Sequence, residues 1–289
     1  MGTIVGWRPS PSGRYTPFRF LRHRGTIKPM KTPTLSDLLD VAVDAAYLAG
    51  KRTLAYFQTG VQPDIKADNT PVTIADREAE KILRARILQS FPDHAILGEE
   101  EGETSGSAPY RWICDPIDGT KSFITGVPLY GVLVGVEVEG EAKVGVIYLP
   151  GTNDMIAAAD GLGCTWNGRP CRVSTTSRLE DASLMTSSII SAQKRSDAFD
   201  KLVSKTRIQR TWGDAYGYAL IATGRADIMV DPKVNAWDVA PMLPILREAG
   251  GHFSDWNGNP TIHGVDAIAT NPALKDAVLN ILGAETQRN

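Results

Sequence analysis

Long apolar runs, zinc-type cysteine spacing and a strong net charge are all missing from this sequence of 289 residues. No stretch approaches the roughly 20 apolar residues of a membrane-spanning helix, so we expect a soluble chain with no membrane partner. The formal net charge of −2 gives no reason to expect nucleic acid as a partner. Cys114, Cys164 and Cys171 are an odd number without metal-ligand spacing, which favours a reduced compartment, and we expect a cytoplasmic protein.

Two common catalytic signatures are also missing. The four histidines lie beside no serine or cysteine in a nucleophile motif, which argues against a Ser-His-Asp hydrolase. Neither a P-loop nor a Rossmann glycine pattern is present, so nucleotide-dependent transfer is poorly supported. The acidic residues are therefore the main candidates for chemistry.

Acidic residues are absent from residues 1–36, which contain seven Lys or Arg residues. We interpret residues 1–33 as a disordered N-terminal extension. Two alternatives stay open. An organelle transit peptide has the same Arg-rich, acid-poor composition, and the segment could also be an upstream extension ahead of a start at Met30.

Hydrophobic periodicity predicts the secondary structure. Helical spacing begins after Pro33 and recurs at residues 76–90, 213–223, 237–249 and 272–282. Short apolar runs predict strands at residues 95–97, 110–114, 131–138, 141–148, 184–186, 226–230 and 267–269. The pattern predicts a mixed α/β sandwich of two tightly joined parts, which we place at residues 34–180 and 181–289.

Three acidic clusters follow predicted strands or begin helices: residues 99–101, Asp115 with Asp118, and Asp238. Carboxylates gathered in one site repel each other, so such a site needs cations. Oxygen donors without Cys or His favour Mg²⁺ over zinc or copper.

The stretch WICDPIDGTKSF, residues 112–123, shows how one segment could build such a site. Pro116 stiffens the bend, so that the two aspartates and the carbonyl of Ile117 could face one point. Gly119 and Thr120 would then open a helix whose first N–H groups suit a phosphate. Each piece alone has an ordinary structural explanation, such as a solvated loop, a turn or a helix cap; only the combination favours function.

The same motifs resemble the inositol monophosphatase superfamily. The resemblance rests on WICDPIDGTKSF, on GEE at residues 98–100, on KADNTPVTIADREAE from Lys66, on ATGRAD from Ala222 and on NAWDVAPMLPILREAGG from Asn235. These occur in the family's order and span residues 35–283. The resemblance implies a five-layer αβαβα sandwich of the sugar-phosphatase type, Mg²⁺-dependent hydrolysis of small phosphate monoesters with two or three ions per site, and a homodimer.

The resemblance also implies a role for each matching position. The implied metal ligands are the side chains of Glu99, Asp115, Asp118 and Asp238 and the carbonyl of Ile117. Glu99 and Thr120 are the implied pair that orients and deprotonates water, and Asp118 is also an implied catalytic residue. Gly119 and Thr120 offer N–H groups to the phosphate. Lys66, Asp76 and Glu100 are implied accessory residues near the metal.

The leaving-group pocket resembles the histidinol-phosphate phosphatase branch of the superfamily. The evidence is the combination of DPIDGTKSF, TWGDAYGY and VDPKVNAWD, in which Lys121-Ser122 replaces the Thr-Asn common among inositol enzymes. Asp214 and Asp231 would select a cationic amine, and Asn235 could contact the imidazole ring. Asp214 could instead cap the following helix.

We therefore predict a histidinol-phosphate phosphatase of histidine biosynthesis in which metal-activated water attacks the ester directly. Two alternatives stay open. One is an inositol-1-monophosphatase or a related sugar or nucleotide phosphatase with a relaxed pocket. The other is a catalytically weak, metal-binding scaffold relative, against which the intact acidic set argues.

Overall fold

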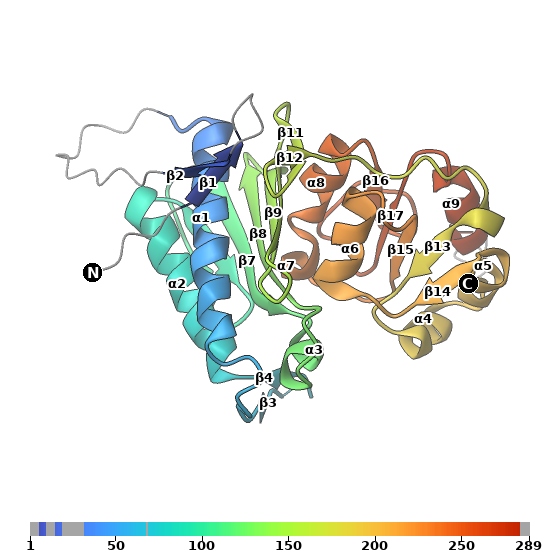
Figure 1. The fold of residues 1–289 in the computed structure, drawn as a ribbon, viewed down its shortest axis with the longest axis horizontal. Coiled ribbons are helices and arrows are strands. Elements are labelled where there is room, and N and C mark those ends of the chain that lie inside the picture. Colours follow the sequence, from blue (N-terminus) through green and yellow to red (C-terminus); the bar gives the residue numbers. More distant parts are fainter. Residues whose placement is uncertain (1–5, 10–14, 19–31, 68, 284–289) are drawn as a thin grey trace.

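The computed structural model describes residues 6–9, 15–18, 32–67 and 69–283. Most of these residues stack in five successive layers of helix, sheet, helix, sheet and helix (Figure 1). The arrangement confirms the predicted mixed α/β fold and its αβαβα layering.

The first layer consists of α1 (Leu35–Leu54) and α2 (Ile74–Ser90), which pack against each other and against the larger sheet. Each helix begins with a capping box, built on Thr34 in α1 and on Thr73 in α2. The buried face of α1 is rich in small side chains, so that the helix lies close to the sheet: Ala42, Ala45, Ala46 and Ala49.

The larger sheet has eight strands and carries the acidic motif at one strand end. Its strand order is β12 (Arg169–Pro170), β11 (Gly163–Trp166), β10 (Asp154–Ala159), β9 (Glu141–Leu149), β8 (Gly131–Val138), β7 (Tyr110–Asp118), β5 (Ala95–Gly98) and β6 (Gly102–Thr104). β5 and β7 pair in parallel, and their carboxyl ends therefore meet at one edge.

The smaller sheet has five strands, and helices cover both of its faces. Its order is β14 (Ile208–Arg210), β13 (Ser183–Met185), β15 (Ile228–Asp231), β17 (Ala267–Thr270) and β16 (His252–Ser254). Between the sheets lie α6 (Asp214–Ala222), α7 (Ala236–Val239) and α8 (Met242–Glu248). The outer layer contains α4 (Ile189–Arg195), α5 (Ala198–Lys205) and α9 (Lys275–Gly283).

Four short elements complete the compact part of the chain. They are β3 (Asp64–Ile65), β4 (Pro71–Val72), α3 (Thr120–Ile124) and the 3₁₀ turn at Leu179–Asp181. α3 begins at Thr120 directly after Gly119, as the sequence predicted.

One predicted element is wrong in its continuity. The helix expected at residues 237–249 is divided into α7 and α8. Pro241 stands at the division, because a proline ring lacks the N–H for an interior helical bond and collides with the preceding turn. The division lets Ala240 approach the larger sheet closely: a Cβ built on Gly135 of β8 would lie 2.5 Å from the Cβ of Ala240.

The predicted boundary between residues 180 and 181 falls between the last strand of the larger sheet and the first strand of the smaller one. Gly6–Pro9 (β1) and Tyr15–Phe18 (β2) pair as antiparallel strands. The remainder of residues 1–31 lies outside the described residues, so the disordered extension stays a prediction. Among the described residues, no helix combines the length and apolar character that crossing a bilayer requires.

Candidate active site

A break in β7 brings two of the predicted ligands together. The strand pairs with β8 through Asp115 and again through Asp118, and the register shifts between them. Pro116 has no N–H for the ladder, and the N–H of Ile117 donates instead to Oδ1 of Asp115 at 2.9 Å. This bulge re-aims the end of the strand, so that both carboxylates serve the same site.

The carboxylates of Asp115, Asp118 and Asp238 form one group, with an oxygen of each within 4.8 Å of the others. In each residue, one oxygen is held by a backbone N–H: Ile117 donates to Asp115, Ala215 to Asp118, and Asn235 to Asp238. The second oxygen of each carboxylate is therefore oriented and available to a ligand.

The charge of this group is unfavourable without a cation. Burial, and after it the charges of Glu99 and Asp118, raises the pKa of Asp115 well above its ordinary value. Burial and the charges of Asp214 and Asp238 do the same for the pKa of Asp118. Burial raises the pKa of Asp238 to about 7. Three mutually repelling carboxylates, of which Asp115 is buried and the other two are partly buried, fit a hard divalent cation such as Mg²⁺.

Glu99 lies beside this group rather than in it, because its carboxylate is outside the set joined at 4.8 Å. It follows the carboxyl end of β5, and its Oε1 accepts from Nζ of Lys66 at 2.9 Å. The same ammonium donates to Oε1 of Glu100 at 2.6 Å. Although burial works in the opposite direction, these two hydrogen bonds raise the pKa of Lys66, so it stays charged. Burial raises the pKa of Glu100 to about 7.

Asp76 supplies an independent sign of a missing positive charge. Its Oδ2 accepts from the N–H and the hydroxyl of Thr73 at 2.8 and 2.7 Å, at the start of α2. Its Oδ1 is buried and has no hydrogen-bond partner. Burial raises the pKa of Asp76, and the charge of Glu99 adds to the rise. An orphaned buried carboxylate oxygen beside other acids fits a nearby cation.

Gly119 and Thr120 turn the chain from β7 into α3. Gly119 has φ 85, a left-handed conformation that glycine adopts without steric cost. The hydroxyl of Thr120 donates to the carbonyl of Ile117 at 3.1 Å, which ties this residue to the proposed carbonyl ligand. A Cβ on Gly119 would lie 3.2 Å from Oδ2 of Asp214, so that carboxylate borders the same turn.

The three predicted substrate residues lie in different environments. Asp214 is the first residue of α6 and has φ 52; its N–H donates to Oγ of Ser187 at 3.1 Å. The helix cap is Gly213, and no side-chain cap bond forms, so the alternative of Asp214 as N-cap is wrong. Asn235 is the N-cap of α7, where the N3 residue is Asp238.

Asp231 is buried at the end of β15 with both oxygens occupied. The hydroxyls of Tyr218 and Ser187 donate to them at 2.9 and 2.5 Å. Burial raises its pKa to about 6. Direct contact with a substrate would have to replace one of these hydrogen bonds.

Sequence reasoning missed Glu80, Arg84, Ser187 and Tyr218, which surround the predicted residues. One signal was available. Glu80 and Arg84 follow Asp76 at helical spacing, so all three occupy one face of α2. Ser187 and Tyr218 carry no comparable pattern.

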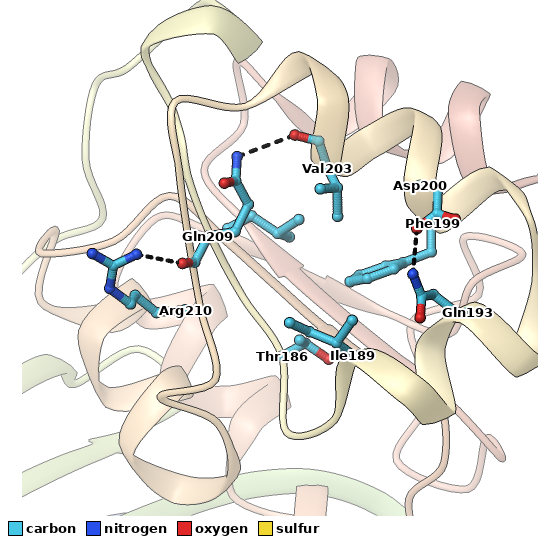
Figure 2. Close-up of a pocket in the computed structure, with 9 residues that line it drawn as sticks. Thr186, Ile189, Gln193, Phe199, Asp200, Val203, Gln209 and Arg210 are labelled. Atoms are coloured by element: carbon cyan, nitrogen blue, oxygen red, sulfur yellow. Dashed lines mark hydrogen bonds between the residues drawn. The ribbon is translucent and has the colours of Figure 1, made fainter.

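A separate cavity of about 60 Å³ lies between β13, β14, α4 and α5 (Figure 2). Its walls are mainly apolar, and Gln209 donates to the carbonyl of Val203 across one end at 3.1 Å. It contains none of the clustered acids, so we take the acidic group, and not this cavity, as the candidate active site.

The αβαβα sandwich, with buried acids where β7 meets α3 and α7, defines a cation-assisted hydrolase of anionic esters. A model of the inositol monophosphatase family matches residues 34–287, and the chain belongs to this family of phosphoric monoester hydrolases. The family acts with Mg²⁺, which agrees with the acidic cluster.

Three relatives illustrate the similarity. The histidinol-phosphatase of Chlorobaculum parvum is 39% identical over 254 residues, covering 85% of this chain and 96% of that protein. The histidinol-phosphatase of Mycobacterium tuberculosis is 38% identical over 230 residues, covering 76% and 88%. The solved inositol monophosphatase of Anabaena (Nostoc) sp. PCC 7120 is 32% identical with a TM-score of 0.76, covering 86% and 96%.

Proposed function

We propose that this phosphatase hydrolyses L-histidinol phosphate, or an ester of the same cationic kind, in histidine biosynthesis. The observation that carries the proposal is the carboxylate of Asp214 beside the Gly119 turn, within electrostatic reach of Asp118. An anion at this position would pair with an ammonium group on the leaving alcohol. The relatives named histidinol-phosphatase support the same substrate.

The acidic residues divide the work around the phosphate. Asp115, Asp118, Asp238 and the carbonyl of Ile117 would hold Mg²⁺, with Glu99 completing the set. Bound Mg²⁺ supplies the positive charge that lowers the pKa of water and stabilises the departing oxygen. We propose two or three ions per site, which the number of acids supports.

The hydroxyl of Thr120 and the carboxylate of Glu99 would orient the attacking water and take its proton. The N–H groups at Gly119 and Thr120, which begin α3, would hold the phosphate oxygens. Lys66 keeps Glu99 and Glu100 in place through its two hydrogen bonds. Asp76 would add negative charge behind the ions, and Asn235 would contact the imidazole.

The direct test compares Mg²⁺-dependent phosphate release from L-histidinol phosphate and from inositol 1-phosphate in parallel. We expect a much higher kcat/KM for histidinol phosphate. Equal rates, or a preference for inositol 1-phosphate, would overturn the substrate assignment and favour the inositol phosphatase alternative, which the Anabaena structure supports. Absence of Mg²⁺-dependent release from both esters would leave the scaffold alternative.

Asp214→Asn tests the residue that selects the cation. Loss of one charge-assisted hydrogen bond should lower kcat/KM for histidinol phosphate by about 10- to 100-fold. The rate with p-nitrophenyl phosphate, which has no amine, should change by less than about threefold. The matched control is Asp64→Asn, because Asp64 forms an exposed ion pair with Arg77. An equal fall with both esters would give Asp214 a structural or catalytic role instead.

We also propose a homodimer in the cytoplasm, on the strength of the family resemblance and the cysteine content. Sedimentation of the purified chain tests the first, and the location of the native protein tests the second.

A further inference from the structure

A wholly buried carboxylate lies directly behind the loop that presents Glu99. Glu80 of α2 is 0% exposed. Its Oε2 accepts from the N–H of Glu100 at 2.7 Å, and its Oε1 accepts from the N–H of Glu101 at 3.0 Å. One side chain of the first layer therefore fixes two successive peptide groups immediately after Glu99.

Arg84, one turn later on α2, secures this carboxylate. Its Nε donates to Oε1 of Glu80 at 2.8 Å, and its Nη1 donates to Oγ1 of Thr104 at 3.0 Å. Its Nη2 also donates to the carbonyl of Gly102. The guanidinium thus neutralises Glu80 and joins α2 to the far side of the same loop.

The packing leaves the loop no room to move toward the helix. A Cβ built on Gly98, the residue before Glu99, would overlap the carboxylate of Glu80 and lie 2.8 Å from Nη2 of Arg84. The loop is therefore held by hydrogen bonds on one side of Glu99 and by direct packing on the other.

A buried ion pair is a poor way to gain stability. Removing two charges from water costs several kcal/mol, and well-packed apolar side chains often stabilise a protein as much or more. What Glu80 offers, and an apolar side chain cannot, is two acceptor oxygens for the N–H groups of a loop that must keep one shape. Loss of a hydrogen bond that holds a metal ligand in place commonly lowers metal affinity by 10- to 100-fold.

We propose that Glu80, held by Arg84, is a positioning residue that fixes the loop of residues 99–101 and so presents the carboxylate of Glu99 to the Mg²⁺ site. This inference rests on the proposed Mg²⁺-dependent function. It assigns to Glu80 no contact with substrate or metal.

The experiment measures Mg²⁺ binding alone, by titration calorimetry of the full chain without substrate. Glu80→Gln removes one acceptor and the charge, whereas Glu80→Asp keeps the charge but shortens the reach. Both variants should bind Mg²⁺ more weakly, with a dissociation constant about tenfold higher than that of the wild type. The matched control is Glu78→Gln, because Glu78 lies on the same helix but accepts hydrogen bonds from Arg52 and Tyr56 at the surface. The Mg²⁺ affinity of this variant should stay within about twofold of the wild-type value.

Hydrogen exchange provides a readout that does not depend on the metal. The amides of Glu100 and Glu101 should exchange about tenfold faster in both Glu80 variants, because each loses a hydrogen bond to a charged acceptor. If neither Glu80 variant folds, Arg84→Lys decides: it keeps the charge opposite Glu80 but loses a contact to Thr104 or Gly102, and affinity should fall about threefold.

The outcomes separate the two proposals. If the wild-type chain takes up no Mg²⁺, the proposed function fails and the inference fails with it. If the wild type binds Mg²⁺ and both Glu80 variants bind equally well, the inference alone is refuted. Loss of affinity in Glu80→Gln with full affinity in Glu80→Asp would also refute it, because charge rather than position would then be the cause.

Discussion

Binding of Mg²⁺ should release protons and strengthen as the pH rises from 6 to 8. The cause is Asp238, because burial raises the pKa of this residue to about 7 in the metal-free protein. Such a group is about 90% protonated at pH 6 and about 10% protonated at pH 8. A cation binds the ionised form, so Asp238 alone should raise the apparent association constant by about tenfold over this interval. The raised pKa values of Asp115 and Asp118 make tenfold a lower limit.

The assay is calorimetric titration of the metal-free protein with MgCl₂ at pH 6, 7 and 8. Each titration is repeated in two buffers of different ionisation enthalpy, because the dependence of the heat on the buffer counts the protons released. We expect close to one proton or more per site at pH 6 and fewer at pH 8. Asp160→Asn, which removes a surface partner of Arg247, is the control and should leave the count unchanged.

Asp238→Asn should bind Mg²⁺ more weakly and with a shallower pH dependence, because it lacks both a ligand oxygen and the titrating group. An affinity that stays within about twofold from pH 6 to pH 8 in the wild type, with no buffer-dependent heat, would refute the reasoning. The acids would then be ionised before the metal arrives, contrary to their burial.

Two further predictions concern stability. Asp115→Asn should abolish Mg²⁺-dependent phosphate release yet raise the melting temperature of the metal-free protein at pH 7.5, because it removes a carboxyl group whose ionised form is destabilised by burial and by the charges of Glu99 and Asp118; a lower melting temperature would contradict this. Burial raises the pKa of Asp231 in the folded protein to about 6, against an ordinary 3.8. Its protonation therefore stabilises the folded state below pH 4 by about 3 kcal/mol, and this contribution is lost as the pH rises through 6. In urea unfolding at pH 4, 5 and 7, the free energy of unfolding should depend less on pH in Asp231→Asn than in the wild type, and an identical dependence would contradict this prediction.

The sequence predicted the parts of the fold in which local pattern and tertiary environment agree. β8 occupies residues 131–138 as expected, and the Glu139-Gly140 turn has φ values of 54 and 83, as a tight hairpin requires. The prediction of one continuous helix over residues 237–249 failed at Pro241. Apolar spacing continues through it, so periodicity alone joined two helices that the proline ring keeps apart.

The acidic group was predictable because its three aspartates lie at a strand end and a helix start that the sequence marks. Asp115 and Asp118 end β7, and Asp238 is the third residue of α7. Glu80 was not predictable in the same way, because a Glu-Arg pair four residues apart is typical of an exposed helix face. Its burial depends on where the loop after β5 lies, which only the tertiary structure determines.

Asp231 shows how a residue could influence the proposed leaving-group pocket although both of its carboxylate oxygens already accept hydrogen bonds. Tyr218 and Ser187 donate to its two oxygens, so its carboxylate is already paired. The hydroxyl of Ser187 donates its hydrogen bond to Asp231, and the same Oγ accepts a hydrogen bond from the N–H of Asp214. Asp214 needs this support, because its φ of 52 is a backbone conformation that residues other than glycine rarely adopt. Asp231 therefore contacts Asp214 indirectly, through Ser187, and the proposed selection of a cationic ester would depend on this chain of hydrogen bonds as much as on the charge of Asp214.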